Sequence, residues 1–434
     1  IKYFKLILII TFYYQTPSYS KNEDFKDFNT AYLSNYFSGI VAYENKDNLN
    51  ALKFFRSSKF LTKKHKPYLK RYIYSLVQEN KVKQAVSEIK QNSKENNSRF
   101  FDARLILALD SLKKKDFKKS KNYLEQSFQF INNDKYALII YETIKQYLYV
   151  FEEKKIKKEK KNFGNLSLIN ETFQRCYLED KSTQLYFDRL KNNNNSDYSR
   201  YLFFYIHYLI ENNKFKEAQQ LSSKLDYLNS TLLISQGKKW IEEEKLGEFN
   251  KIFSCKNQND IVAEFFFLVA NIYSSQNDYE KSNFYLYISN YLNPKFKFNL
   301  ALVVENYYLN KNYKKAKKTL EYFNENDDFY YWFKVKKQAQ IISKELSDKT
   351  SFNFINKKFK KIKNPSIRMV LDLANFNKNS KNYQNAINYY DIIISKIDPN
   401  SDIYADILYR RGSSYERLGN YIKSDKDFLK SLEI

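Results

Sequence analysis

The chain of 434 residues has few of the residues on which most enzyme and metal sites are built. It contains only 2 histidines and 2 cysteines. His65 lies in a lysine-flanked turn and His207 in an apolar segment, and neither stands at a metal-ligand spacing from a cysteine. No glycine-rich phosphate loop occurs. The sequence therefore predicts no catalytic residue, no cofactor and no metal, and favours a binding protein over an enzyme.

Glycine and proline are also scarce, with 6 and 5 residues. No segment between turn signals alternates apolar and polar residues as a strand would, so we expect an all-α fold. The few glycines nevertheless recur at two spacings from the residue that ends a polar turn. Gly412 and Gly39 stand twelve residues before Ser424 and Ala51, and Gly419 and Gly247 stand five before Ser424 and Ile252. Repeated spacing in a glycine-poor chain indicates an internal repeat.

The residue that ends each such turn gives the period of the repeat. It is small at nearly every position and recurs at intervals of about 34 residues, the length of a helix–turn–helix unit. The series is Ala51, Ala85, Ser120, Ala218, Ile252, Ser282, Ala316, Ala386 and Ser424. Two antiparallel helices can pack closely only where side chains are small, and larger residues one turn away fill the space between hairpins.

These motifs resemble the tetratricopeptide repeat, most clearly in LYRRGSSYERLGNYIKSDKDFLKSLEI at residues 408–434. The resemblance implies an α-solenoid of antiparallel helix–turn–helix repeats that forms a right-handed superhelix. The opening AYLSNYFSGIVAYENKDNLNALKFFRSSKFL and the closing segment also resemble exported tetratricopeptide proteins of alphaproteobacteria, which implies export but no particular activity.

We expect four parts in the chain. Residues 1–20 read as a signal peptide, residues 21–132 as three repeats, residues 133–197 as a degenerate repeat or a joint, and residues 198–434 as about six repeats with an irregular stretch at 327–364. Within the joint, 134–153 reads as one long amphipathic helix. Because apolar residues at the last turn lack a neighbour, we expect the natural protein to continue beyond Ile434.

The N-terminal segment predicts export. Lys2 and Lys5 precede the apolar run Leu6–Tyr14, and small residues follow at the positions that favour cleavage after Ser20. The run is too short to span a bilayer. The sequence therefore predicts a periplasmic protein, with a cytoplasmic adaptor as the alternative if the run is a buried helix. Because repeats touch only their neighbours, Cys176 and Cys255 are expected to be buried free thiols.

The formal net charge is +25, a value that would suit nucleic acid or anionic lipid. The basic residues are mostly lysine, whereas nucleic-acid sites concentrate arginine and stacking aromatics, so no nucleic-acid partner is expected. A solvated outer surface is the favoured interpretation, and peripheral contact with a membrane or an anionic polysaccharide is the alternative function.

The expected function is a protein–protein scaffold whose partner, a helix or an extended segment, lies in a groove lined by first helices. No first helix has the Lys and Asn pair of repeats that grip a C-terminal carboxylate, so that ligand is not expected. Aromatic clusters such as Phe203–Tyr205 point in successive directions, and we expect some of these rings to be exposed. The groove candidates are Tyr36, Tyr74, Phe267, Asn271, Glu305, Tyr308, Asp406, Tyr409 and Arg417.

Overall fold

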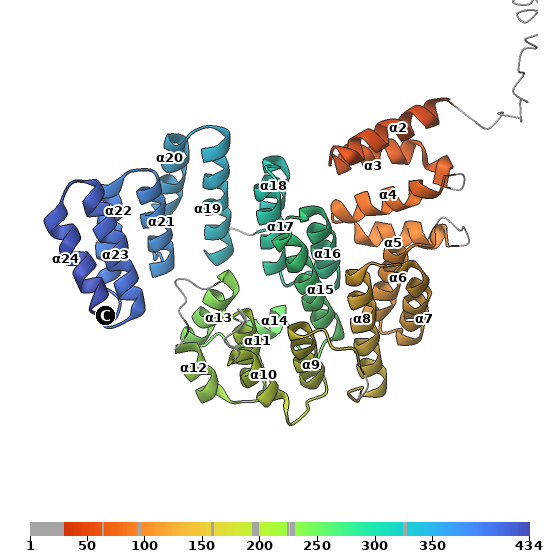
Figure 1. Ribbon diagram of the computed structural model, residues 1–434, viewed down its shortest axis with the longest axis horizontal. Coiled ribbons are helices and arrows are strands. Elements are labelled where there is room, and N and C mark those ends of the chain that lie inside the picture. The colour runs from red at the N-terminus through yellow and green to blue at the C-terminus, as the bar shows by residue number, and fades with distance from the viewer. Residues whose placement is uncertain are drawn as a thin grey trace, which may run out of the picture. The chain divides into compact units, whose positions relative to one another are not determined.

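The computed structural model of the protein describes residues 30–62, 65–93, 98–157, 160–192, 199–223, 225, 231–323 and 328–434. These residues form helices joined by short turns, without a strand (Figure 1). The prediction of an all-α solenoid of helical hairpins is therefore confirmed. The expected signal peptide, residues 1–20, lies outside the described residues. Among those that are described, no helix is long and apolar enough to cross a membrane.

The chain divides into two compact units, Ile1–Arg99 and Phe100–Ile434. The predicted block boundaries after residues 132 and 197 do not coincide with this division and stay predictions. In the first unit each helix packs on the next one along the chain. Its helices are α2 (Thr30–Glu44), α3 (Asn48–Ser57), α4 (Lys66–Gln78) and α5 (Val82–Gln91), with a 3-10 turn at Lys59–Thr62.

The second unit contains the remaining helices, and most of them pair as antiparallel hairpins (Figure 1). They are α6 (Phe101–Lys113), α7 (Phe117–Ser127), α8 (Lys135–Glu153), α9 (Asn165–Tyr177), α10 (Thr183–Lys191), α11 (Ser199–Glu211), α12 (Phe215–Ser223), α13 (Leu232–Glu242), α14 (Gly247–Ile252), α15 (Gln258–Ser275), α16 (Tyr279–Leu292), α17 (Phe298–Leu309), α18 (Tyr313–Leu320), α19 (Asp328–Glu345), α20 (Asp348–Phe359), α21 (Ile367–Asn379), α22 (Tyr383–Ile394), α23 (Asp402–Arg417) and α24 (Tyr421–Leu432).

One turn recurs between the helices of a hairpin. A residue with positive φ ends the first helix, and an Asp or Asn then caps the second helix by accepting from a backbone N–H three residues later. Asn277 (φ 62°) followed by Asp278, whose side chain accepts from Lys281 N at 3.1 Å, is typical. Gly419 (φ 75°) takes the same place before α24. The polar turns seen in the sequence are these capped turns.

The twelve-residue spacing marks the closest approach within a hairpin. A Cβ added to Gly412 would meet the ring of Phe428 at 3.0 Å, and one added to Gly39 would meet the ring of Phe55 at 2.8 Å. Both glycines therefore admit an aromatic ring from the second helix directly against the backbone of the first. This is the packing that the repeat predicted.

The five-residue spacing at Gly247 was assigned wrongly. Gly247 begins α14 and nothing lies within 4 Å of its would-be Cβ, whereas the positive φ of that hairpin belongs to Glu244 (56°). The close approach is made by Gly237, whose added Cβ would meet the ring of Phe203 at 2.9 Å and that of Phe249 at 3.5 Å. The repeat position given to Ile252 therefore belongs to Phe249, three residues earlier.

The stretch at 327–364 holds a complete hairpin, α19 and α20. Ser351 Oγ of α20 donates to the carbonyl oxygen of Ala339 in α19 at 2.5 Å, across twelve positions. Ser120 Oγ makes the equivalent bond to Ala108 at 2.7 Å. Ser351 therefore supplies the missing member of the series between Ala316 and Ala386.

Helix α15 departs from a simple stack of neighbours, because it also contacts α6, α8 and α9. Its residues Phe265, Phe266 and Phe267 are all buried. The rings of Phe203, Phe204 and Tyr205 in α11 are buried too. The expectation that part of these clusters is exposed is therefore wrong, because helices from more than one hairpin cover them.

The cysteines are joined, contrary to the expected free thiols. Cys176 at the end of α9 and Cys255 before α15 form a disulfide, with 5.8 Å between their Cα atoms. The prediction assumed contact between adjacent repeats alone, and α9 in fact lies against α15. The packing of α9 against α15 therefore brings together two cysteines that are 79 positions apart in the sequence.

Candidate partner-binding face

The helices α17, α19, α21 and α23 are the first helices of four successive hairpins in the second unit. Polar side chains on these helices contact one another from each hairpin to the next. We call this surface the first-helix face. It comprises Glu305, Tyr308, Lys336, Lys337, Asp372, Asn375, Asp406, Tyr409 and Arg410.

Between α17 and α19 the contact is made by Lys337. Its ammonium donates to Glu305 Oε2 at 2.8 Å and lies 4.4 Å from the centre of the Tyr308 ring. The Lys337 side chain is only 6% exposed, against 38% for Glu305. Burial lowers the pKa of Lys337, and the Glu305 carboxylate opposes that shift. The pair fixes Tyr308 beside a buried cation while leaving the carboxylate accessible.

Between α19 and α21 the acceptor is Asp372. Its carboxylate accepts from Lys336 Nζ at 3.0 Å and from Trp332 Nε1 at 3.0 Å. Trp332 is 4% exposed and packs inside the second unit. The carboxylate of Asp372 is therefore held from the core side by a buried indole and bound by a partly exposed lysine at the surface.

Between α21 and α23 the contact runs through Asn375 and Arg410. Arg410 Nε donates to both carboxylate oxygens of Asp406, at 3.0 and 2.9 Å, and Nη1 donates to Asn375 Oδ1 at 3.4 Å. Asn375 Oδ1 also accepts from Tyr390 OH at 2.7 Å. Burial lowers the pKa of Lys378, helped by the positive charges of Arg410 and Arg417.

Tyr409 is the most accessible aromatic ring on this face, with 58% of the residue exposed. Its ring lies 5.5 Å from that of Phe428, so the second helix supports it from beneath. Arg417, at the end of α23, is exposed as well. Because the ring is already held in place on one side, a partner can pack against its exposed side at little cost in conformational entropy.

The other predicted groove residues lie elsewhere. Tyr36 is 4% exposed in the core of the first unit, where its hydroxyl accepts from Arg71 Nη1 at 3.1 Å. Tyr74 in α4 is half-buried, with its ring 5.9 Å from that of Tyr43. Phe267 in α15 is 9% exposed under the guanidinium of Arg200, 3.7 Å from the ring centre.

Asn271, one turn beyond Phe267 on α15, is exposed. The structure therefore joins Glu305 and Tyr308 through Lys337 and places Asp406, Tyr409 and Arg417 together on α23. Tyr36 and Phe267 are core residues in this structure. A role in partner binding stays a prediction for the rest.

Sequence reasoning missed Lys336, Lys337, Asp372 and Arg410. Lys336 and Lys337 lie on α19, where no repeat register had been found, whereas Asp372 lies on α21, in a hairpin whose register was predicted. Ser351, twelve residues after Ala339, was the signal that would have supplied the register. Among the described residues no group of histidine, cysteine and carboxylate side chains could hold a metal ion.

The tetratricopeptide repeat family model matches residues 405–434. No protein with curated annotation matches the chain. Several solved structures are similar. They include the APC/C hetero-tetramer Cut9–Hcn1 (12% identity, 92% of this chain and 80% of that chain covered, TM-score 0.32) and yeast Tom70 (12% identity, 93% and 92% covered, TM-score 0.33). The P58(IPK) TPR domain is a third (11% identity, 89% and 98% covered, TM-score 0.24). TM-scores this low carry no argument about how the repeats are arranged.

The matched residues are those of α23 and α24, the hairpin that contains the close approach at Gly412 and the turn at Gly419. Hairpins with the same capped turn, twelve-residue spacing and small packing positions recur in both units. The hairpin at residues 405–434 therefore matches a tetratricopeptide repeat, and the other hairpins of the chain resemble it in these features.

Proposed function

We propose that this protein is a non-enzymatic scaffold that binds a partner protein along the first-helix face of the second unit. The observation that carries the proposal is the continuous row of side chains across α17, α19, α21 and α23. A helix or an extended segment of a partner could follow that row, in contact with Tyr308 and Tyr409.

The charges on the face favour specificity over raw affinity. Glu305, Asp372 and Asp406 each already hold a cation, so a partner meets oriented ion pairs and leaves no isolated charge buried. The aromatic rings of Tyr308 and Tyr409 supply contact area between these pairs. Binding energy is therefore expected to depend on the two tyrosines, and the choice of partner on the ion pairs.

Photo-crosslinking tests the face directly. A benzophenone amino acid placed at Tyr308 or Tyr409 should crosslink the same partner in cells of the natural host, and Tyr308→Ala with Tyr409→Ala should reduce capture at least tenfold. Tyr421 on α24 is the matched control, because it is 66% exposed on a second helix. Equal capture by the double alanine variant, or crosslinking from position 421 alone, would refute the assignment.

We further propose that the protein is exported to the periplasm and acts there, beside machinery for envelope assembly or export. The disulfide between Cys176 and Cys255 supports this location, because structural disulfides persist in oxidising compartments and are rare in the cytoplasm. The charged and apolar pattern of residues 1–20 supports it independently.

Two measurements test the location. Protein taken from the natural host should begin at Lys21 and should show no titratable thiol when it is unfolded without reductant. Two free thiols and an intact Ile1 would instead favour the cytoplasmic adaptor.

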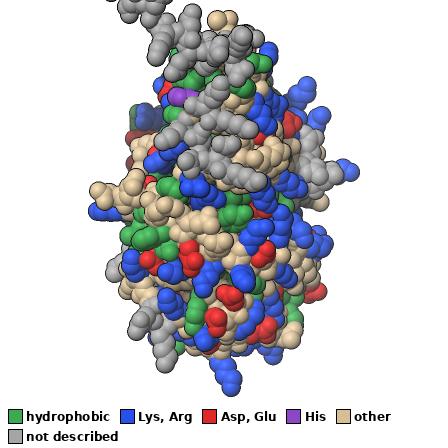
Figure 2. Space-filling model, turned by 90° about the vertical axis from the view of Figure 1, so that its right-hand side faces the viewer, with side chains coloured by type: hydrophobic (Ala, Val, Ile, Leu, Met, Phe, Trp, Pro, Cys, Tyr) green, Lys and Arg blue, Asp and Glu red, His purple; other side chains and the backbone are tan. Residues whose placement is uncertain are grey.

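The alternative is attachment to an anionic membrane or polysaccharide through lysine. Figure 2 shows basic side chains spread among acidic ones over the described part of one face, without a separate patch. That spread favours a solvated surface. Attachment through lysine should weaken steeply between low and physiological salt, whereas binding on the first-helix face should change little.

A further inference from the structure

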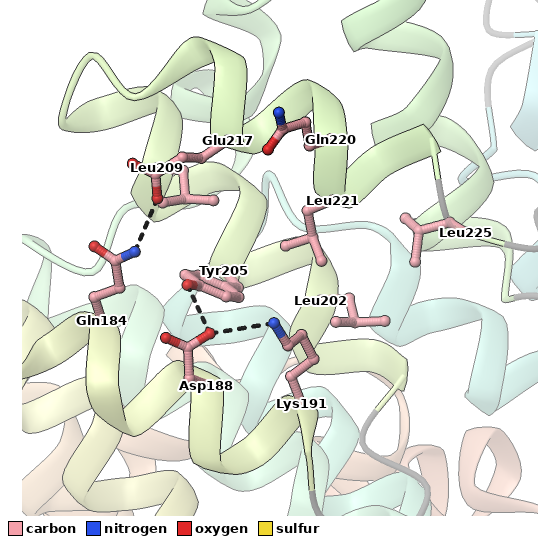
Figure 3. A pocket seen from close by; sticks show the side chains of 10 residues that line it. All are labelled: Gln184, Asp188, Lys191, Leu202, Tyr205, Leu209, Glu217, Gln220, Leu221 and Leu225. Carbon is pink, nitrogen blue, oxygen red and sulfur yellow. Dashed lines mark hydrogen bonds and ion pairs between the residues drawn. The ribbon is translucent and has the colours of Figure 1, made fainter.

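A cavity of about 470 Å³ opens between α10, α11 and α12, away from the first-helix face (Figure 3). Its volume falls within the range of sites that hold small ligands or anchoring side chains. Tyr205 and Leu209 of α11 are buried and form part of its lining, and Leu202, Leu221 and Leu225 add further apolar surface. The cavity therefore offers an apolar wall for a side chain of moderate size.

Two carboxylates stand at the same cavity. Asp188 Oδ1 accepts from Tyr205 OH at 2.9 Å, and Glu217 Oε2 accepts from Gln184 Nε2 at 2.8 Å (Figure 3). The side chain of Asp188 is 36% exposed and that of Glu217 is 48% exposed. Both carboxylates are thus held in place by a neutral donor and remain open to a ligand.

The cations that accompany these carboxylates form exposed ion pairs with them, and Lys214 Nζ also donates to Gln184 Oε1. Lys191 Nζ lies 3.3 Å from Asp188 Oδ1, and Lys214 Nζ lies 4.0 Å from Glu217 Oε1. All four side chains are more than a third exposed, and ion pairs of this kind contribute little free energy. Among the described residues, both contacts of Asp188 are to Oδ1, which leaves Oδ2 able to accept from a ligand. A better-placed cation can therefore replace the lysines.

The hydroxyl of Tyr205 lies close to both carboxylates of the cavity wall. The pKa of its hydroxyl is raised by burial, then by the hydrogen bond to Asp188 and by the charges of Asp188 and Glu217. This is notable in a chain with 74 basic and 49 acidic residues, where carboxylates are in the minority.

We propose that this cavity binds an arginine side chain of a partner segment, with an adjacent apolar residue against Leu202 and Leu221. A guanidinium is planar and donates in parallel to a carboxylate, so it matches Asp188 better than an ammonium does. The inference rests on the proposed protein-binding function and adds a second anchor, on α10–α12, to the contacts of the first-helix face.

Calorimetry with short peptides tests the proposal on the full chain. The probe is acetyl-Leu-Arg-Ala-Leu-amide, and the matched probe carries citrulline, which has the shape of arginine without its charge. We expect the arginine peptide to bind roughly tenfold tighter than the citrulline peptide, the size of effect that one charge-assisted contact gives. Free butylguanidinium, as a third probe, should bind more weakly than the arginine peptide.

Three variants separate the contact from the fold. Asp188→Asn should weaken binding of the arginine peptide roughly tenfold, and the asparagine oxygen can still accept from Tyr205. Lys191→Gln should tighten binding several-fold, because it removes the competing ammonium. Glu248→Gln is the control, since Glu248 pairs with Lys251 on α14, outside the cavity.

Each outcome decides the proposal. Equal binding of the two peptides, no binding at millimolar concentration, or an unchanged affinity of Lys191→Gln would overturn it. If butylguanidinium bound as tightly as the peptide, the proposal that the ligand is a partner's arginine side chain would be refuted, and the cavity would be assigned to a small molecule. Crosslinking at Tyr308 and Tyr409 is an independent measurement, so the proposed function can hold where this one fails.

Discussion

Removing the disulfide between Cys176 and Cys255 should destabilise the second unit by several kcal/mol. The bridge spans 79 positions of the sequence. In the chain-entropy relation, closing a loop of that length removes about 4.5 kcal/mol of unfolded-state entropy at 25 °C, and measured values for native bridges are typically about 2–4 kcal/mol. We therefore expect the variant Cys176→Ala with Cys255→Ala to lose roughly 2–4 kcal/mol.

Urea unfolding followed by the fluorescence of Trp240 measures this loss. Trp240 is 9% exposed on α13 and its ring lies 5.1 Å from that of Phe249, so its emission reports on the packing around α11 and α14. Substituting Trp332→Phe leaves Trp240 as the one tryptophan. The oxidised protein should unfold at a higher urea concentration than the double alanine variant.

Reductant provides the control for this experiment. It should lower the midpoint of the oxidised protein to that of the alanine variant and leave the variant unchanged. Equal midpoints before and after reduction would show that the bridge does not stabilise this unit. Two reactive thiols in the untreated, unfolded protein would show that the bridge does not form.

Three further predictions concern packing and protonation. Gly412→Ala should destabilise its hairpin by about 1–3 kcal/mol, because the added Cβ overpacks against Phe428. Gly247→Ala has open space around its Cβ and should be neutral or stabilising by about 0.4–1 kcal/mol. Thermal unfolding of the two variants compares these effects. Glu264→Gln leaves the guanidinium of Arg200, only 16% exposed, without its charge partner, and should lower the unfolding free energy by about 3–5 kcal/mol; an unchanged urea midpoint would contradict this. Burial raises the pKa of Asp260 from 3.8 to about 6. Between about pH 4 and pH 6 the folded state therefore keeps a proton that the unfolded chain has released, and the unfolding free energy should fall as the pH rises through this range. Asp260→Asn should remove that dependence.

The local part of the fold could be read from the sequence. A helical hairpin needs a turn that reverses the chain and a small residue where the helices meet, and both leave marks at fixed spacing, as at Gly412 and Ser424. The same reasoning placed Ile252 three residues away from its true equivalent, Phe249. There the small residue sits on the first helix, at Gly237, and a large ring occupies the position that is elsewhere small.

The non-local part could not be read in that way, because spacing describes contact between neighbours. Most residues of α15 between Ile261 and Ala270 are buried, and the contacts with α6, α8 and α9, the Arg200–Glu264 pair and the disulfide show which helices cover them. A helix segment that is hydrophobic all round must be surrounded by protein, and the cluster at Phe203–Tyr205, for which exposed rings were expected, is buried for the same reason. At the first-helix face, Tyr308 and Tyr409 were found by register, whereas the ion pairs that join successive hairpins depend on side-chain reach across helices.

The cross-contacts of α15 also determine how the chain should respond to a pulling force. Hairpins from α17 to α24 touch along the chain order and can be peeled away one after another, each releasing a short length. The segment between α6 and α16 is tied by Tyr291 OH donating to Asp110 at 2.8 Å and by the paired charges of Arg200 and Glu264. Because these contacts bear load together, the segment between α6 and α16 should unfold in one large extension. Under tension the second unit should therefore show several short extensions followed by a long one.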